Sequence, residues 1–521
     1  MSTGNIPEMD DGFNYANYLL ELNRRRGDKT AYIDDLGSLS YRELDERIKR
    51  MANALLAAGV RREERVFLLM HDCNDWPVAF LGAMYAGIVP VAVNTLLTAD
   101  DYLYMLQHSR SQLVLASAAL LPNLREAMAR GDHEVHSIMV SQAVDDLQSG
   151  EQSLEACLQA VAATAEPANT GPNDPGFWLY SSGSTGKPKG TVHTHANPYW
   201  STKLYGQGVL GIRENDICFS AAKLFFAYGL GNALTFPLSV GATSVLFGGR
   251  PTPDVIYEKL IAHQPTIFFG APTGYAAMLA AADLPEPEQL GLRLAVSAGE
   301  ALPADLAQRF TRHFGIDVID GIGSTEMLHI FLSNQPGNVR YGSTGWPVPG
   351  YDIELRGDDG LPVADGELGD LYCRGPSVAL MYWGNRLKSA ETFQGEWAKS
   401  GDKYIRNEDG SYTCSGRTDD MLKVSGMYVS PFEVEATLSE HPAVMESAVI
   451  GVSDDDGLVK SKAFVVLLEG QQASADDLKA FVKSRLAPYK YPRFIEFVDE
   501  LPKTATGKIQ RFRLRDGEAS A

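Results

Sequence analysis

The sequence has 521 residues, of which 45% are hydrophobic and 21% are charged, which is a globular composition. The length exceeds what one ordinary core uses, so at least two folding units are expected. The formal net charge of −20 argues against nucleic acid or an anionic membrane surface as a partner, because either would need a basic face. A polyanionic ligand must therefore meet a local basic cluster.

The cysteines and the N-terminal segment favour a reducing, cytoplasmic environment. Five cysteines without a CxxC spacing fit neither a disulfide framework nor a zinc site, so all five are predicted to be structural. The segment 1–10 is polar and acidic, which argues against a signal peptide. The uncharged stretch 76–93 is divided by two prolines and two glycines, so we expect a buried helix followed by a strand and no membrane insertion.

Helix and strand signals alternate along the first part of the chain. A capping box at Ser40–Glu43 starts a helix whose apolar residues, from Leu44 to Leu56, recur on one face, and 66–70 follows as an apolar strand. This order indicates an α/β fold. The run 149–173 is predicted to be a helix and loop that connects two subdomains. The order of helix and then strand recurs at 100–108 before 113–115 and at 252–263 before 266–269.

The pattern changes after about residue 418. A capping box with proline at the first helical position starts at Ser430, and its helix is expected to end at His441. Strand candidates at 448–452, 463–468 and 494–498 and a helix from Ser474 follow. We therefore predict an N-terminal domain over 1–418 that binds ATP and an acid, and a C-terminal α+β domain over 419–521, which is a normal domain size.

The first motif is Tyr180-Ser-Ser-Gly-Ser-Thr-Gly-Lys-Pro-Lys-Gly190, which follows an apolar run. Such a sequence predicts a buried strand that ends in a tight loop, where backbone amides, hydroxyls and lysines face an anion. It is not a Walker loop, because the second glycine follows Gly183 too soon and Pro188 removes an amide where the phosphate-capping helix would begin. A flexible surface turn is the alternative.

The first motif resembles the phosphate-binding signature of the adenylate-forming enzymes, a superfamily that includes acyl-CoA synthetases, peptide-synthetase adenylation domains and firefly luciferase. Further motifs that resemble this superfamily extend from Tyr180 to Lys508, so the resemblance covers most of the chain. It implies that this loop holds the phosphates of ATP. The implied ligands are Ser181, Ser182, Gly183, Ser184, Thr185, Gly186 and Lys187.

The second motif is Asp320-Gly-Ile-Gly-Ser-Thr-Glu326, which follows an apolar segment. Thr325 can donate to a phosphate, and Glu326 is a hard oxygen ligand suited to Mg²⁺, although a lone glutamate after a turn is usually a solvated surface charge. The resemblance implies that Thr325 binds the α-phosphate and that Glu326 binds the metal. It assigns Asp320, Gly321, Ile322, Ala298, Gly299 and Glu300 to the adenine side of the ATP site.

The next motifs are Ser400-Gly-Asp402 and 416–426. A carboxylate can accept both hydroxyls of a ribose, and a neighbouring arginine can add hydrogen bonds, although each residue alone would be read as an ordinary surface charge. The resemblance assigns Asp402 and Arg417 to the ribose and makes Asp419 the hinge between the domains. It also places Ser425 and Gly426 at the binding site for the pantetheine arm of coenzyme A.

The last motif lies at 502–511. A lysine so near a C-terminus would ordinarily be read as flexible and without a role. The resemblance instead implies that Lys508 is catalytic and enters the site, where it neutralises the substrate carboxylate and the α-phosphate, since two anions cannot approach without such a cation.

The segments 225–232 and 327–331 are candidates for the acid pocket. Apolar residues are more often core than pocket, and a histidine here is more often a satisfied buried side chain than a ligand. Both segments closely resemble those of benzoate-CoA ligases, which implies a slot about one ring thick between Ala227 and Gly323. One departure is at Phe226, where many members of the superfamily have histidine, so the resemblance does not imply how this gate is held. The predicted pocket residues are Phe226, Ala227, Tyr228, Gly323, His329 and Ile330.

The resemblance implies a large α/β domain of the adenylate-forming type with a small, mobile C-terminal α+β domain. The implied reaction joins benzoate, or a close aromatic carboxylate, to CoA through an acyl-AMP intermediate, with Mg²⁺ as cofactor and with release of AMP and pyrophosphate. Alternatives are a ligase for hydroxybenzoate or another small carboxylate, an adenylation enzyme that loads a carrier protein, a luciferase-like oxygenase, and an ATP-binding scaffold. A homodimer and a cytoplasmic location are further expectations.

Overall fold

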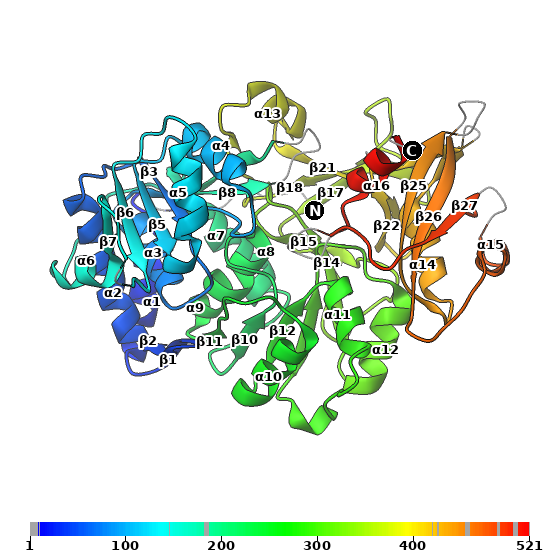
Figure 1. Cartoon of the computed structure of the whole chain (residues 1–521), viewed down its shortest axis with the longest axis horizontal. Helices are drawn as coiled ribbons and strands as arrows, with labels where there is room; N and C mark the ends of the chain where they lie inside the picture. Colours follow the sequence, from blue (N-terminus) through cyan, green and yellow to red (C-terminus); the bar gives the residue numbers. More distant parts are fainter. Residues whose placement is uncertain are drawn as a thin grey trace.

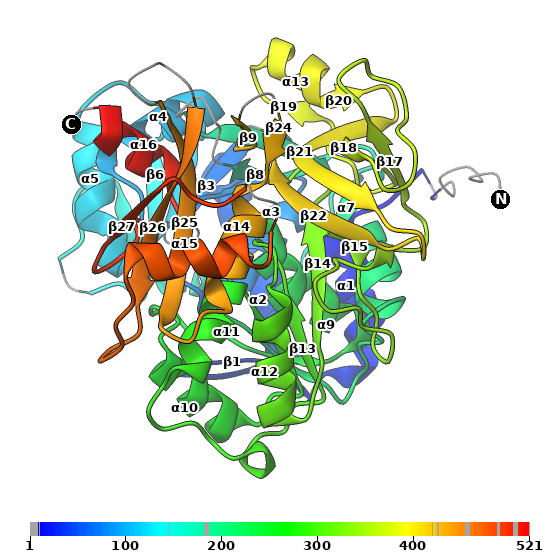
Figure 2. The ribbon, with the colours of Figure 1, turned by 90° about the vertical axis from the view of Figure 1, so that its right-hand side faces the viewer.

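The structure is a computed structural model, and it describes residues 9, 11–144, 146–181, 187–418, 420–424, 427–453, 459–486, 490–503 and 509–519. Figure 1 shows the N-terminal part of the chain on the left, the central part below, and the C-terminal unit on the right. Figure 2 looks onto this C-terminal unit, drawn in orange and red, with α11 (Pro272–Leu279) and α12 (Ala304–Phe314) below it.

The first sheet has the strand order β19-β9-β8-β4-β3-β5-β6-β7. The strands from β8 to β7 are parallel. At one edge of the sheet, β9 runs antiparallel to β8, and β19 runs antiparallel to β9. Its central strands are continuously apolar and buried, as expected for a parallel sheet that is covered on both faces. The strands are β3 (Arg65–Leu69), β4 (Val89–Ala92), β5 (Leu113–Ser117), β6 (Ser137–Ser141), β7 (Glu151–Ser153), β8 (Pro175–Ser181), β9 (Lys189–Thr194) and β19 (Met381–Tyr382).

The second sheet has the strand order β16-β15-β14-β13-β12-β10-β11-β1-β2 and is parallel from β14 to β1. Because parallel strands end at the same edge, the segments after β13 and β14 lie side by side there. The strands are β1 (Thr30–Asp34), β2 (Gly37–Ser40), β10 (Ile217–Ser220), β11 (Thr243–Val245), β12 (Ile267–Gly270), β13 (Leu294–Ser297), β14 (Val318–Gly323), β15 (Ile330–Ser333) and β16 (Trp346–Pro347).

A third, antiparallel sheet follows, in which β17, β18, β21 and β20 are neighbours and β22 pairs with β21. Figure 1 shows it at the top of the molecule, between the large sheets and the C-terminal unit. The strands are β17 (Asp352–Arg356), β18 (Leu368–Arg374), β20 (Phe393–Gln394), β21 (Trp397–Arg406) and β22 (Tyr412–Arg417).

The C-terminal unit contains the hairpin β23 (Leu422–Val424) and β24 (Met427–Val429), and the sheet β25 (Val444–Ser453), β26 (Val459–Leu467) and β27 (Phe494–Phe497). Its helices α14 and α15 cover one face of that sheet, and Val434, Leu438, Leu478 and Val482 are buried in a separate core there. A core of its own is what an independently moving domain requires.

Several helices begin directly after a residue whose side chain caps their N-terminus. Both bonds of the capping box predicted at Ser40 and Glu43 are present. The helix α3 is buried all round, because its residues are apolar on every side. The helices are α1 (Tyr15–Asn23), α2 (Tyr41–Ala57), α3 (Asp75–Tyr85), α4 (Ala99–Ser109), α5 (Leu121–Ala129), α6 (Leu154–Gln159), α7 (Ala196–Ser201), α8 (Ala227–Leu230), α9 (Phe236–Val240), α10 (Pro253–His263), α11 (Pro272–Leu279), α12 (Ala304–Phe314), α13 (Arg386–Thr392), α14 (Pro431–Ser439), α15 (Ala475–Lys483) and α16 (Arg511–Ala519).

The predicted α/β class with a small α+β domain is confirmed, and some local predictions need correction. Leu56 was expected on the buried face of α2, but it is half exposed. The second capping box is only half formed, because the carboxylate of Glu433 pairs with Lys490 instead of bonding back to the cap amide. The run 149–173 begins with the edge strand β7 and the helix α6, which packs on α2. No helix among the described residues is both long and apolar enough to cross a membrane.

Candidate active site

The first motif closes an antiparallel hairpin. Ser181 at the end of β8 pairs with Lys189 at the start of β9, so the strands hold both ends of the predicted phosphate loop. The ammonium of Lys187 is exposed and lies 5.2 Å from the ring centroid of Tyr104. The hydroxyl of Ser181 is buried and has no hydrogen-bond partner among the described residues. The predicted ligands Ser182, Gly183, Ser184, Thr185 and Gly186 lie outside the described residues.

The predicted adenine residues lie together at the carboxyl ends of two adjacent parallel strands. Ser297 on β13 is the register partner of Asp320 on β14. Asp320 is buried, and burial raises the pKa of its carboxyl well above the usual value. Gly299 has φ +96°, which a residue with a side chain rarely adopts, and Glu300 then accepts a hydrogen bond from the hydroxyl of Thr273 at 2.8 Å.

The metal motif is held from two sides. Nε2 of His193, on β9, donates to the carbonyl oxygen of Thr325 at 2.8 Å. The hydroxyl of Tyr382, on β19, donates to Oε1 of Glu326 at 2.7 Å. Leu328, just beyond, has φ +66°, a strained value for a residue with a side chain and one that is typical of functional turns. The turn is thus fixed to the same hairpin that holds the phosphate loop.

His193 is neutral in this arrangement. It is fully buried and stacks on Phe177 at 5.0 Å, and burial lowers the pKa of its imidazole to about 4. Since the carbonyl of Thr325 can only accept, Nε2 carries the single proton. Because His193 is neutral, the charged groups of the site are Glu326 and the lysines of the first motif, such as Lys187 and Lys189.

The predicted ribose residues lie opposite each other on adjacent strands. Asp402 on β21 is the register partner of Arg417 on β22, and Nη1 of Arg417 donates to Oδ1 of Asp402 at 3.1 Å. Burial raises the pKa of the Cys414 thiol to about 12, and the charges of Asp402 and Asp320 add to that rise. Asp402 and Asp320 are therefore close to the same buried thiol, which joins the predicted ribose and adenine sites.

The predicted pocket residues Tyr228, Gly323, His329 and Ile330 come together in the structure. Nε2 of His329 lies 3.2 Å from both the carbonyl oxygen of Tyr228 and Oδ1 of Asn232. Gly323 and Ile330 are register partners, and a Cβ on Gly323 would lie 2.5 Å from the carbonyl oxygen of His329. Any side chain at position 323 would thus force the two segments apart.

Among the predicted pocket residues, His329 is buried and carries no charge. The ring is buried among Tyr205, Tyr228 and Phe236, and burial lowers the pKa of its imidazole to about 3. The ring is therefore neutral, and its Nδ1 has no partner among the described residues. Phe226 precedes α8 with an extended backbone, and its ring contacts that of Phe225, which belongs to the core around α3.

The remaining predicted residues, Asp419, Ser425, Gly426 and Lys508, lie outside the described residues. Arg511 is described, three positions after Lys508. Burial lowers the pKa of the Arg511 guanidinium, but Glu435, Asp420 and Glu300 more than offset this and raise it. Glu300 belongs to the predicted adenine segment, so a charge of the large domain acts on an arginine near the end of the chain.

Sequence analysis missed His193, Lys189 and Tyr382 as members of the site. The ammonium of Lys189 lies 4.4 Å from the ring centroid of Tyr382, whose hydroxyl contacts Glu326. Lys189 and His193 stand within or just after the first motif, which could have suggested them. Tyr382 follows an ordinary apolar run, and nothing in the sequence distinguishes it.

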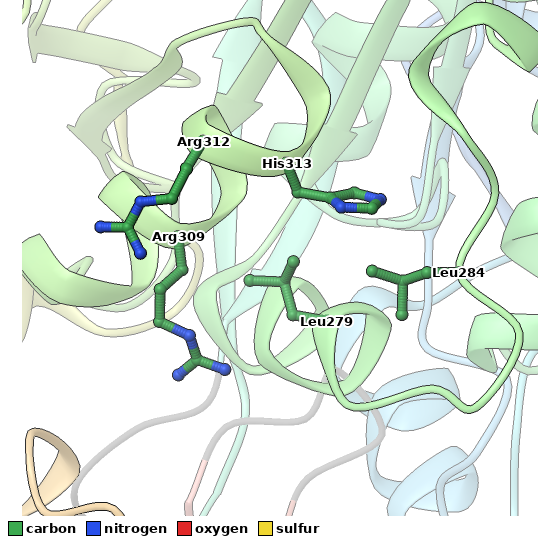
Figure 3. Close-up of a pocket in the computed structure, with 5 residues that line it drawn as sticks. All are labelled: Leu279, Leu284, Arg309, Arg312 and His313. Atoms are coloured by element: carbon green, nitrogen blue, oxygen red, sulfur yellow. The ribbon is translucent and has the colours of Figure 1, made fainter.

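A cavity of about 330 Å³ lies elsewhere, between α11 and α12. Figure 3 shows that its lining side chains come from α12 and from the end of α11 with the loop that follows. None of these side chains belongs to a predicted motif, so this hollow is not the proposed site. The lining residues are Leu279, Leu284, Arg309, Arg312 and His313.

The described residues include no group of three or more His, Cys, Asp and Glu side chains that could hold a metal by themselves. A site with a single carboxylate still fits Mg²⁺, because this ion usually binds one or two carboxylates together with substrate phosphates and water. Glu326 offers one such carboxylate beside the phosphate-loop hairpin.

Comparison with known proteins agrees with this geometry. The sequence model described as "AMP-binding enzyme" matches residues 20–383, and the one described as "AMP-binding enzyme C-terminal domain" matches residues 433–508. The chain is 53% identical over 517 residues to a benzoate-CoA ligase of Thauera aromatica, an alignment that covers 98% of this chain and 96% of that protein.

Solved structures agree in fold. The crystal structure of a benzoate CoA ligase from Burkholderia xenovorans LB400 has a TM-score of 0.91 and 57% identity, and the match covers 96% of this chain and 100% of that one. An anthranilate CoA ligase in complex with anthranoyl-AMP has a TM-score of 0.94 and 42% identity, with coverage of 100% and 99%. The resemblance noted in the sequence is thereby confirmed.

Proposed function

This chain belongs to the family of AMP-binding enzymes, and from that premise we propose that it is a benzoate-CoA ligase. It joins benzoate to coenzyme A through benzoyl-AMP, with release of pyrophosphate and then AMP. The observation that supports this most strongly is that His193 on β9 and Tyr382 on the neighbouring strand β19 fasten the metal motif beside the phosphate loop. Just beyond that motif, the neutral ring of His329 is buried among aromatic side chains. The similarity to benzoate-CoA ligases over nearly the whole chain supports the choice of acid.

In the first half-reaction, an oxygen of the benzoate carboxylate attacks the α-phosphorus of ATP and pyrophosphate leaves. The loop from Ser181 to Lys187 holds the leaving phosphates, and Thr325 donates to the α-phosphate. Lys508 supplies the positive charge between the two anions, since their approach is the main electrostatic barrier. Asp320 and Asp402 orient the nucleoside, so that binding energy is used for alignment.

Mg²⁺ fits this site as the cofactor, with Glu326 as its protein ligand. When bound, it neutralises phosphate charge. In the part of the chain that is described, burial lowers the pKa of Lys189 and the charge of Glu326 counteracts this. Arg417 lowers the pKa values of both Lys189 and Tyr382, so it too acts at this place. These cations add to the positive field that a polyanionic nucleotide needs in a protein of net charge −20.

In the second half-reaction, the thiol of coenzyme A attacks the carbonyl of benzoyl-AMP and AMP leaves. We place the boundary between the domains at 418/419, with Asp419 as the hinge about which the small domain turns. The turn withdraws Lys508 and brings Ser425 and Gly426 to the pantetheine arm. Neither half-reaction needs a covalent enzyme intermediate.

The neutral pocket favours an uncharged ring. His329 carries no charge at pH 7, and Tyr205, Tyr228 and Phe236 surround it, so a second carboxylate on the substrate would have no cation to meet among these residues. The pocket is formed by Phe226, Ala227, Tyr228, Gly323, His329 and Ile330.

The test is pyrophosphate release across benzoate, hydroxybenzoates, anthranilate, propionate and octanoate, followed by thioester formation with free CoA. We expect benzoate to have the highest kcat/KM and free CoA to accept the acyl group. A higher kcat/KM for a hydroxybenzoate would select the hydroxybenzoate alternative. Pyrophosphate release without transfer to free CoA would select an adenylation enzyme that loads a carrier protein.

A further inference from the structure

Tyr382 connects three parts of the site that are far apart in the sequence. It lies on β19, where it pairs with Thr191 of β9, and it is 3% exposed. Its hydroxyl donates to Oε1 of Glu326 at 2.7 Å. Its ring packs against Phe393 at 5.3 Å. A tyrosine that served only as a core residue would need only the ring contacts. Tyr382 also makes polar contacts with two charged side chains, Glu326 and Lys189.

Lys189 fixes the direction of the hydrogen bond. Its ammonium lies 3.4 Å from the phenol oxygen of Tyr382 and 4.4 Å from the ring centroid. An ammonium can only donate, so the phenol oxygen accepts from Lys189 and its own proton goes to Glu326. The carboxylate of Glu326 can only accept, so the phenol keeps its proton for that bond. A cation beside the oxygen makes the O–H a stronger donor.

The backbone of the metal motif is already held without Tyr382. The amide of Ala379 donates to the carbonyl oxygen of Glu326 at 2.8 Å, and His193 donates to that of Thr325. The Tyr382 bond therefore acts on the rotamer of the Glu326 side chain. It occupies one carboxylate oxygen and leaves Oε2 as the other candidate ligand atom.

From this arrangement we infer that Tyr382 is the positioning residue that presents the Glu326 carboxylate to the divalent cation, with Lys189 strengthening its hydrogen bond. The inference rests on the proposed function in taking Glu326 as the metal ligand. Partners of this kind around metal-ligating side chains fix ligand orientation, and their loss typically lowers metal affinity by about 10- to 100-fold.

The variant Tyr382→Phe tests this, because it keeps the ring against Lys189 and Phe393 and removes only the hydroxyl. The readout is Mn²⁺ binding, followed by electron paramagnetic resonance, to the full-length enzyme with a non-hydrolysable αβ-methylene analogue of ATP. We expect an affinity about 10- to 100-fold lower than that of the wild type. The concentration of Mg²⁺ that gives half the maximal rate of pyrophosphate release should rise in parallel.

Tyr351→Phe is the matched control. It also removes a buried hydroxyl near the metal motif, since Tyr351 contacts Ser377 at 2.7 Å and Ser377 donates to the carbonyl oxygen of Met327, but it leaves Glu326 untouched. Unchanged Mn²⁺ affinity in this variant supports a direct role for Tyr382. An equal loss in both variants would mean general loosening of the motif and would overturn the inference.

Glu326→Ala separates this inference from the proposed function. If Glu326 is the ligand, its loss weakens Mn²⁺ binding, and adding Tyr382→Phe produces no further loss, because the two side chains act as one unit. If Tyr382→Phe binds Mn²⁺ as tightly as the wild type while Glu326→Ala binds it more weakly, the role of Tyr382 is overturned and the assignment of Glu326 as the ligand stands. Wild-type affinity in Glu326→Ala overturns the metal assignment as well.

Discussion

The hydroxyl of Thr418 donates a hydrogen bond to Oδ1 of Asp370 at 2.9 Å, which fastens the end of β22 to the large domain. Asp370 itself is held by Lys399 at 3.0 Å and Lys403 at 3.2 Å. Asp420 pairs instead with Arg515 and lies near Arg511, both on α16 of the small domain. The two anchors flank position 419, which supports the proposal that the hinge is there.

Asp419→Pro should leave benzoyl-AMP formation largely intact and should reduce thioester formation. Proline locks φ, so it blocks rotation at this position without removing a ligand of the nucleotide. Two backbone bonds, from the amides of Asp420 and Met421 to the carbonyl oxygen of Arg417, must also break during rotation. The measurement is single-turnover kinetics of each half-reaction, and normal overall turnover with CoA would show that the pivot is elsewhere.

Lys508→Ala should abolish benzoyl-AMP formation and largely preserve thioester formation from supplied benzoyl-AMP. Its charge is needed only while the carboxylate and the α-phosphate approach each other. The two rates are measured separately, by pyrophosphate release and by loss of free thiol. Equal losses in both half-reactions would contradict the role proposed for this lysine.

Arg511 should matter for the same half-reaction, because it anchors the segment that carries Lys508. Its Nη2 donates to both oxygens of Glu435, at 2.9 and 2.7 Å, and the adjacent residues Lys503 and Ile509 form a bridge. Arg511→Met should slow benzoyl-AMP formation by about 10- to 100-fold through misplacement of the lysine, and should slow thioester formation less.

Two controls distinguish misplacement from unfolding. Arg511→Met leaves Glu435 buried without its ion pair, which costs about 3–5 kcal/mol, and adding Glu435→Gln removes that unpaired charge. The double variant should therefore regain thermal stability but not the rate of adenylation. Arg485→Met, at an exposed ion pair of the same domain, should leave adenylation unchanged. Recovery of the rate along with stability would contradict the positioning role.

The strand that leads into the phosphate loop and the parallel strands were predictable because their signals are local. An apolar run that turns into glycines, hydroxyls and lysines reports a strand end, as at Ser181. The antiparallel sheet β17–β22 was not predicted. The strands β17 and β21 are only partly buried, and their buried positions do not alternate regularly with the others, so hydrophobic periodicity gives a weak signal there.

Contacts between motifs could not be predicted from the sequence. His193 and Thr325 are 132 positions apart, and Tyr382 and Glu326 are 56 apart. In each pair, one residue lies on a strand of the first sheet and the other follows β14 of the second sheet. Whether these segments meet depends on the topology of the two sheets. The family resemblance implied residue roles without these contacts, which is why Tyr382 was missed.

Ala227→Leu should reduce kcat/KM for benzoate more than for propionate. Position 227 begins α8 and is followed by Tyr228, whose hydroxyl is held by the carbonyl oxygens of Gly270 and Val296, so the segment cannot easily retreat. Crowding of a ring edge should cost about 1–3 kcal/mol. The assay is pyrophosphate release with each acid, and octanoate should be poor even in the wild type. An unchanged benzoate-to-propionate ratio would contradict the proposed slot.

His193→Gln should make the protein less sensitive to acid. Nε2 of a glutamine can donate to the carbonyl oxygen of Thr325 as the imidazole does at 2.8 Å, so we expect the free energy of unfolding at pH 7.5 to stay within about 1 kcal/mol of the wild type. The variant should therefore differ from the wild type in its free energy of unfolding only in the pH range where the imidazole of His193 titrates.

The sign follows from the pKa of His193, which is about 4 in the folded protein and about 6.5 in the unfolded chain. Above pH 6.5 the imidazole is neutral in both states and has no pH effect. As the pH falls from 6.5 to 4, the unfolded chain binds a proton that the folded protein does not, so the wild type loses stability, by up to about 3 kcal/mol.

His195 and His329, whose pKa values are also lowered, titrate in both proteins and cancel in the comparison. Urea unfolding at pH 7.5, 5.5 and 4.5 should thus show the variant gaining on the wild type as the pH falls, whereas parallel losses would mean that His193 is not held neutral in the fold.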